Sequence, residues 1–106
     1  MNKSLWQIQT EVAAWNKKNF GKQSDWEQLL GLVEEVGELS HAVLKAHQGI
    51  RTNEDHEAAA KDAIGDMLIY LMNFCNCRGY DLQTLLNETW DQVSKRDWTK
   101  NKVDGN

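Results

Sequence analysis

Two segments of this sequence carry acidic side chains at the spacing of one helical turn. In the first segment, Glu34 and Glu38 are four residues apart and share one face of a helix. Glu35 lies three residues before Glu38, toward one flank of that face. Taken alone, such a face is most simply solvated, because charged residues usually face water. Its chemistry therefore depends on what the face meets.

The second segment is apolar around nearly its whole circumference, over residues 64–75, and this predicts a buried helix. Yet Asp62, Asp66 and Asn73 fall on one narrow stripe of that helix. A buried carboxylate is costly unless it is paired or bound to a metal. No Lys or Arg lies on the stripe, and Lys61 is placed to reach only Asp62. Asp66 therefore needs a partner from another helix, or a cation.

Carboxylates from two helices converge if the Glu34–Glu38 face packs against the Asp62–Asp66 stripe. Like charges so close together cannot all stay ionised without a cation. Because no Cys or His joins the cluster, all-oxygen ligation favours Mg²⁺, with Mn²⁺ as a possible substitute, over zinc. Two alternatives need no metal: a solvated acidic face on the first helix and a satisfied buried carboxylate on the second.

The elements that must position these side chains are helices. The sequence has no proline, and glycine marks the breaks instead. We expect helices from Ser4 to about Asn19, from Ser24 to about Ala46, from Thr52 to about Arg78, and from Asp81 to about Arg96. Ser4 and Ser24 each begin a capping box, and Gly21, Gly49 and Gly79 are the stop signals. Short connections predict an all-α, four-helix antiparallel bundle.

The composition is that of a globular protein with one domain. The chain has 106 residues, so residues 1–106 form a single domain, with a core over about 4–96 and a polar tail over 97–106. A net charge of −4 argues against a binder of polymeric nucleic acid. The longest apolar stretch, residues 67–75, is too short to span a membrane, and we expect no signal peptide and a cytoplasmic location.

At the two acidic segments the chain resembles a known family. The stretch Glu34-Glu35-Val36-Gly37-Glu38-Leu39, followed by Asp62-Ala63-Ile64-Gly65-Asp66-Met67-Leu68-Ile69-Tyr70-Leu71, is similar to the MazG-like all-α nucleoside triphosphate pyrophosphohydrolases. The resemblance covers about residues 5–96. It implies that Glu35, Glu38 and Asp66 bind the metal and are catalytic. It also implies a homodimer or a dimer of dimers.

One position departs from the family pattern. The residue three before Asp66 is usually acidic in the family, and here it is Ala63. Asp62 stands one residue earlier and remains close to the face of Asp66, so it is one candidate for the missing ligand. Glu34, which shares a face with Glu38, is the other.

The resemblance implies hydrolysis between the α and β phosphates, which yields a nucleoside monophosphate and pyrophosphate. It also places basic residues at the end of the helical core, matched by Lys95 and Arg96, whose alternative role is to interact with a helix C-terminus. The first helix and the loop after it contribute to the nucleobase pocket in the resemblance, so Trp15, Asn16 and Phe20 are candidates for substrate binding. Asn16 could read a base edge through its donor and acceptor.

Three functions remain open at this point. The first is Mg²⁺-dependent hydrolysis of a canonical or aberrant (deoxy)nucleoside triphosphate, in the service of nucleotide-pool house-cleaning. The second is a phosphoribosyl-ATP or dUTP pyrophosphohydrolase. The third, of another class, is a non-catalytic helical interaction module whose acidic faces are only solvated.

Overall fold

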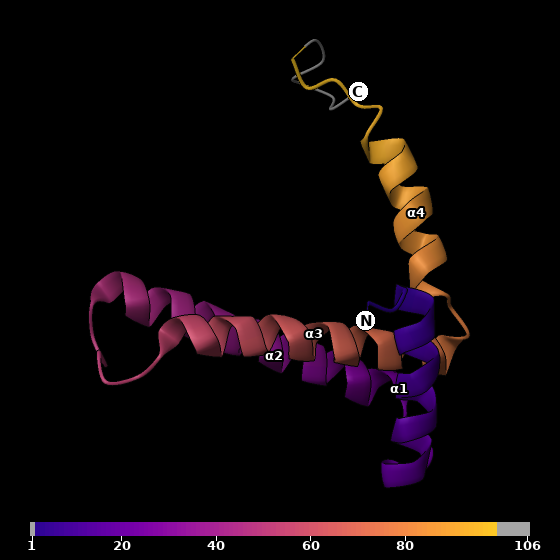
Figure 1. The fold of residues 1–106 in the computed structure, drawn as a ribbon, viewed down its shortest axis with the longest axis horizontal. Coiled ribbons are helices and arrows are strands. Elements are labelled where there is room, and N and C mark those ends of the chain that lie inside the picture. The colour runs from indigo at the N-terminus through magenta and orange to yellow at the C-terminus, as the bar shows by residue number, and fades with distance from the viewer. Residues whose placement is uncertain (1, 100–106) are drawn as a thin grey trace.

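The computed structural model describes residues 2–99, and over these residues the chain forms helices and no strands (Figure 1). The helices are α1 (Leu5–Phe20), α2 (Asp25–Gln48), α3 (His56–Arg78) and α4 (Leu82–Val93). The all-α prediction with four helices is confirmed. Residues 100–106 of the expected polar tail lie outside the described residues. No helix in the described part of the chain is both long and apolar enough to cross a membrane.

At α1, α2 and α4, the residues expected to cap the N-terminus of the helix do so in the structure. Ser4 forms a capping box with Gln7 at α1, and Ser24 forms one with Glu27 at α2. The Asp81 side chain caps α4. The third helix, however, does not begin at Thr52. Asp55 is its N-cap, because the Asp55 carboxylate accepts a hydrogen bond from the Ala58 amide at 2.9 Å and so satisfies a backbone donor of the first turn.

The fourth helix ends earlier than expected. It stops at Val93, and Ser94 is its C-cap. Lys95 and Arg96 therefore lie in the turn after the helix. Their backbone amides donate to the carbonyls of Gln92 and Val93, a spacing tighter than that of an α-helix.

Helices α2 and α3 form an antiparallel hairpin, which is the most extensive packing in the chain (Figure 1). The Tyr70 ring of α3 lies directly against Gly31 of α2, in space where a Cβ atom at position 31 would overlap it. Gly31 is buried, and Tyr70 is half-buried. Because only glycine leaves this room, the contact sets the register of the two helices.

Helix α1 crosses one end of the hairpin (Figure 1), and the buried Gln9 makes several of the hydrogen bonds that hold it there. The buried Gln9 amide donates to Asn76 Oδ1 and to the Tyr80 carbonyl, both at 2.8 Å. The Leu82 amide donates to Gln9 Oε1 at 2.9 Å. One side chain thus joins α1 to the end of α3 and the start of α4.

A single chain does not close the four helices into a compact bundle. Helix α4 projects away from the hairpin and packs on α1 (Figure 1). The radius of gyration is 17.3 Å, whereas a compact domain of this length has about 13 Å. The expectation that α3 is buried on all sides is wrong for the single chain, because Ile64 and Leu68 are 50% and 44% exposed. The described residues 2–99 of one chain leave this side of α3 partly open to solvent.

The contact between Gly31 and Tyr70 leads to a stability prediction. Gly31→Ala should lower the free energy of unfolding by about 1–3 kcal/mol, because the added methyl group collides with an aromatic ring. Urea unfolding at fixed protein concentration measures the effect. Gly37→Ala is the matched control: a Cβ at position 37 meets nothing within 4 Å, so this change should be neutral or stabilising. Equal unfolding midpoints for Gly31→Ala and the wild type would show that the ring does not need the glycine.

Candidate active site

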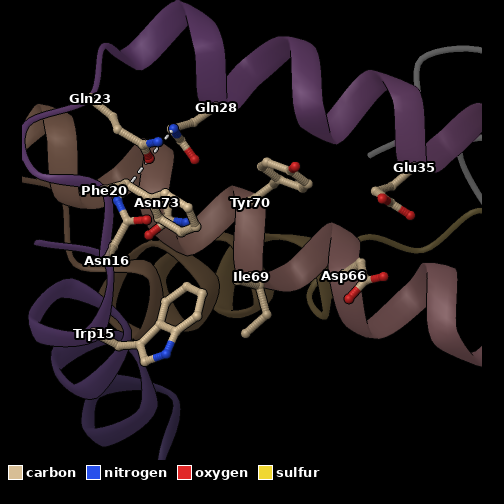
Figure 2. Close-up of a pocket in the computed structure, with 10 residues that line it drawn as sticks. All are labelled: Trp15, Asn16, Phe20, Gln23, Gln28, Glu35, Asp66, Ile69, Tyr70 and Asn73. Atoms are coloured by element: carbon tan, nitrogen blue, oxygen red, sulfur yellow. Dashed lines mark hydrogen bonds between the residues drawn. The ribbon is translucent and has the colours of Figure 1, made fainter. Parts of the chain in front are cut away.

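A hollow of about 430 Å³ opens where α1, α2 and α3 meet (Figure 2). Aromatic and amide side chains surround one end of it, and two carboxylates stand at the other. The residues that line it are Trp15, Asn16, Phe20, Gln23, Gln28, Glu35, Asp66, Ile69, Tyr70 and Asn73.

The register of the α2–α3 hairpin explains why the amide side chains lie at one end of the hollow and the carboxylates at the other. On α2, Gln28 precedes Gly31 by three residues and Glu35 follows it by four, so the three share one face. On α3, Asp66 precedes Tyr70 by four residues and Asn73 follows it by three. Since the helices are antiparallel, Gln28 and Asn73 lie on one side of the Gly31–Tyr70 contact and Glu35 and Asp66 on the other, as Figure 2 shows. We call these the amide end and the carboxylate end.

At the carboxylate end, Glu35 of α2 and Asp66 of α3 both line the hollow (Figure 2). Glu35 is half-buried and Asp66 is exposed. Burial raises the pKa of Glu35 above its usual value, and the charges of Asp66, Glu38 and Glu34 raise it further. The structure therefore brings together, at one end of the hollow, two of the three carboxylates that the resemblance implies.

The other predicted ligands are placed differently. Glu34 and Glu38 line a separate hollow on α2 together with Gly37 and His41. Asp62 is exposed on α3 and does not line the hollow of Glu35 and Asp66. In the described part of the chain, no three His, Cys, Asp or Glu side chains gather closely enough to hold a metal ion. The structure thus brings together two of the predicted carboxylates, with Glu38 one helical turn along from Glu35.

At the amide end, three side chains form a hydrogen-bonded network (Figure 2). Asn16 Nδ2 and Gln28 Nε2 both donate to Gln23 Oε1, at 2.9 and 2.8 Å. The rings of Trp15 and Phe20 pack edge to face beside the network, with centroids 5.6 Å apart. The structure therefore brings the three predicted nucleobase-pocket residues, Trp15, Asn16 and Phe20, into the same hollow as the carboxylates.

Comparison with known proteins shows the family of the chain. A family model described as the MazG nucleotide pyrophosphohydrolase domain matches residues 23–99. The chain belongs to this family. A search of curated proteins and a search of solved structures each gave no match. The matched segment of the MazG domain spans α2, α3 and α4, and so includes both carboxylates of the hollow.

The departure of this MazG domain from the family pattern has a structural counterpart. Ala63 is 2% exposed, and the register that sets Glu35 opposite Asp66 sets Glu38 opposite Ala63. An acidic side chain at position 63 would face Glu38 across the hairpin. With alanine there, Glu38 has no carboxylate opposite it, and the cluster is smaller than the family pattern implies.

The donor chemistry of the carboxylate end fits a hard divalent cation. Carboxylate oxygens are the ligands that Mg²⁺ prefers. The raised pKa of Glu35 shows a carboxylate that neighbouring negative charges disfavour in its ionised form, and a cation would reverse that effect. Glu34 is the chain neighbour of Glu35 and lines a different hollow, and Asp62 lies one turn before Asp66, so both stay candidate substitutes.

Lys95 and Arg96 do not reach the hollow in one chain. They follow α4, and Lys95 pairs with Asp91 at 3.2 Å in an exposed ion pair. Such a pair contributes little to stability. Their expected role in substrate binding stays a prediction.

Sequence reasoning gave no role in the site to five residues that line the hollow: Gln23, Gln28, Ile69, Tyr70 and Asn73. Two of them carried a readable signal. Asn73 lies seven residues after Asp66, and Gln28 lies seven before Glu35, so each shares a helical face with a carboxylate. A polar residue two turns away from a proposed ligand, on the face that packs, is a candidate for the same site.

The raised pKa of Glu35 predicts a pH-dependent stability in metal-free protein. A carboxyl group whose pKa is raised by folding destabilises the fold when it is ionised, and this penalty disappears as the pH falls through the folded pKa to the ordinary value of 4.5. Glu35→Gln should therefore raise the melting temperature at pH 7, with a gain that vanishes below about pH 4.5.

Melting curves in the presence of a chelator, taken from pH 4 to pH 8, measure this gain. Glu57→Gln is the control, because Glu57 makes only an exposed ion pair with Lys61. A melting temperature that falls in Glu35→Gln at pH 7 would mean that the Glu35 carboxylate is stabilising, against the account.

Proposed function

We propose that this MazG domain hydrolyses a nucleoside triphosphate between its α and β phosphates, giving a nucleoside monophosphate and pyrophosphate with Mg²⁺ as cofactor. One observation carries the proposal: a single hollow has an amide and aromatic end and a carboxylate end, with the Tyr70 ring between them. Gln28 and Glu35 are seven residues apart, a rise of about 10 Å along the helix. A nucleotide has the same order of parts: base, sugar and phosphates.

The residues divide the work as follows. Trp15 and Phe20 offer apolar ring surface to the base, and the amides beside them offer hydrogen bonds. Glu35, Glu38 and Asp66 would hold Mg²⁺, which supplies charge neutralisation for the phosphates and activation of water. A carboxylate oxygen of this end accepts the proton of the attacking water. The water oxygen forms a bond to phosphorus, the α–β anhydride bond breaks, and pyrophosphate leaves with the bonding electrons. Such an activity would remove selected triphosphates from the nucleotide pool.

The catalytic prediction concerns the three carboxylates. With Mg²⁺ present, Glu35→Gln, Glu38→Gln and Asp66→Asn should each lower the rate of pyrophosphate release by at least about 100-fold, because loss of a ligand also misplaces the attacking water. The variants should remain folded, since each change relieves repulsion between carboxylates. The assay measures pyrophosphate from a panel of (d)NTPs, which also separates a dUTP-specific or phosphoribosyl-ATP-specific enzyme from a broader one.

Controls complete this assay. Glu57→Gln, near the start of α3 and far from the hollow, should keep the wild-type rate. Glu34→Gln and Asp62→Asn should each lower the rate less than the three ligand changes do. Hydrolysis by Asp66→Asn at the wild-type rate would place the site elsewhere. Stabilisation by Asp66→Leu with no Mg²⁺-dependent turnover in the wild type would favour an interaction module instead.

We also propose that the chain assembles with itself, as a dimer or a dimer of dimers. Leu29, Val33, Val36 and Val43 are each 42–58% exposed in one chain and recur on α2 at the spacing of a helix–helix seam. Large apolar side chains on α4 are exposed as well, among them Leu85, Leu86 and Trp90. A second copy of the chain would cover a surface that monomers rarely leave open.

Light scattering at micromolar concentration should therefore give the mass of a dimer or a tetramer. Val33→Lys should shift the protein toward smaller species, because the charge would enter the seam, while its helical content stays unchanged, since Val33 is 57% exposed in the single chain. A wild type that is monomeric at this concentration would refute the assembly.

A further inference from the structure

Among the described residues, the buried polar side chains are Gln9, Gln28 and Asn73, and they differ in how fully they are paired. Gln9 uses both ends of its amide, as described above. Gln28 donates one hydrogen bond and makes no other within the described chain. Asn73, 5% exposed, has a fully enclosed Oδ1 with no partner there. An unpaired buried carbonyl opposes folding, so Asn73 calls for a ligand with hydrogen-bond donors, and the neighbouring Gln28 has an acceptor that makes no hydrogen bond among the described residues.

In the structure, the network at the amide end turns the NH₂ group of Gln28 toward Gln23. Gln23 Oε1 accepts from both Asn16 and Gln28, so each of these amides turns its NH₂ group toward Gln23. Their carbonyl oxygens consequently point away from Gln23, and Figure 2 shows both directed toward the space beside Asn73. The amide end therefore presents hydrogen-bond acceptors to whatever enters the hollow.

Asn73 adds an adaptable partner to these oriented groups. Neither end of its amide makes a hydrogen bond within the described residues, so rotation about its last torsion can turn Oδ1 toward a donor. Asn73 alone could bind a base edge that presents either a hydrogen-bond donor or a hydrogen-bond acceptor. Gln28 is oriented by its hydrogen bond to Gln23, and its free carbonyl oxygen favours a base edge that presents a donor.

We propose that Gln28 and Asn73 select nucleobases that carry an exocyclic amino group, as cytosine and adenine do, over their keto counterparts. The proposal rests on the proposed nucleotide site and specifies its substrate class. An amino group donates to the carbonyl oxygens of Gln28 and Asn73. Uracil and hypoxanthine place a carbonyl oxygen at the same position, where it would face the carbonyl oxygen of Gln28, so acceptor would meet acceptor.

Matched substrate pairs test this selection directly. We expect kcat/KM with Mg²⁺ to be at least about 10-fold higher for dCTP than for dUTP, and likewise for dATP over dITP, because each pair differs in the amino group that the site reads. Gln28→Met keeps the shape of the side chain and removes its acceptor, so the ratio should fall toward one. Gln92→Met, at an exposed position of α4, should leave the ratio unchanged.

A second variant covers the case in which Gln28→Met does not fold. Gln23→Met leaves Gln28 in place but removes the acceptor that orients it, and Gln23 is only half-buried in the loop before α2. This variant should also reduce the preference for dCTP. An unchanged preference in both folded variants would overturn the assignment of Gln28.

Binding of nucleoside monophosphates separates this inference from the proposed reaction. Titrations of metal-free protein with dCMP and with dUMP, followed by tryptophan fluorescence, report base selection without hydrolysis. Tighter binding of dCMP than of dUMP that depends on Gln28 supports the inference, even if no triphosphate is hydrolysed. The absence of hydrolysis would contradict only the proposed function. Hydrolysis of dUTP equal to or faster than dCTP, with dUMP bound as tightly as dCMP, overturns the inference and leaves the proposed function standing.

Discussion

The packing of the Tyr70 ring against Gly31 is the contact on which the rest of the site depends. It sets the register of the α2–α3 hairpin, and helical periodicity then assigns every other pairing. Three residues before Gly31 comes Gln28, opposite Asn73, and four residues after it comes Glu35, opposite Asp66. A shift by one residue would rotate each of these side chains by about 100° and separate both pairs. The amide end and the carboxylate end are therefore consequences of one steric fit.

Both ends of the hollow carry polar groups that the chain itself does not satisfy. At the carboxylate end, burial raises the pKa of Glu35, and the neighbouring negative charges raise it further. At the amide end, Asn73 Oδ1 is enclosed without a partner. Elsewhere in the described chain a buried amide such as Gln9 is fully paired, so the two deficits are local to the hollow. A metal-bound nucleotide would supply positive charge to one end and donors to the other, which is the physical link between the fold and the proposed substrate.

Much of this arrangement could be predicted from the sequence, because helix signals are local. The Ser4 and Ser24 capping boxes and the glycine stops follow from residues within one turn of each helix end. The predicted start of α3 was wrong because Thr52 and Asp55 are both suitable N-cap residues. Only the conformation of the folded loop shows that Asp55 caps the helix. The cost of an unpaired carboxylate in an apolar helix predicted a glutamate of α2 near Asp66, but on the Glu34–Glu38 face; the family resemblance, and not that cost, singled out Glu35.

The remainder depended on packing that no local pattern encodes. Asn73 shares a helical stripe with Asp66 and Gln28 shares a face with Glu35, but this spacing does not show that both amides are buried beside one hollow. The burial of α3 was overestimated because apolar residues around the whole helix predict burial without saying which chain provides it. Ile64 and Leu68 are exposed in one chain for this reason, and the exposed apolar seam of α2 is explained in the same way if a second copy covers it.

The central claim is that a divalent cation binds where Glu35 faces Asp66. Substoichiometric Mn²⁺, added to isotopically labelled protein, broadens the NMR signals of nuclei near the bound ion and so maps its position. The account predicts that the signals of Glu35, Glu38 and Asp66 broaden first, those of Gln28 and Asn73 much less, and that Asp66→Asn abolishes the effect. Broadening centred on Asp62, or on His41 with the Glu35 and Asp66 signals intact, would contradict it.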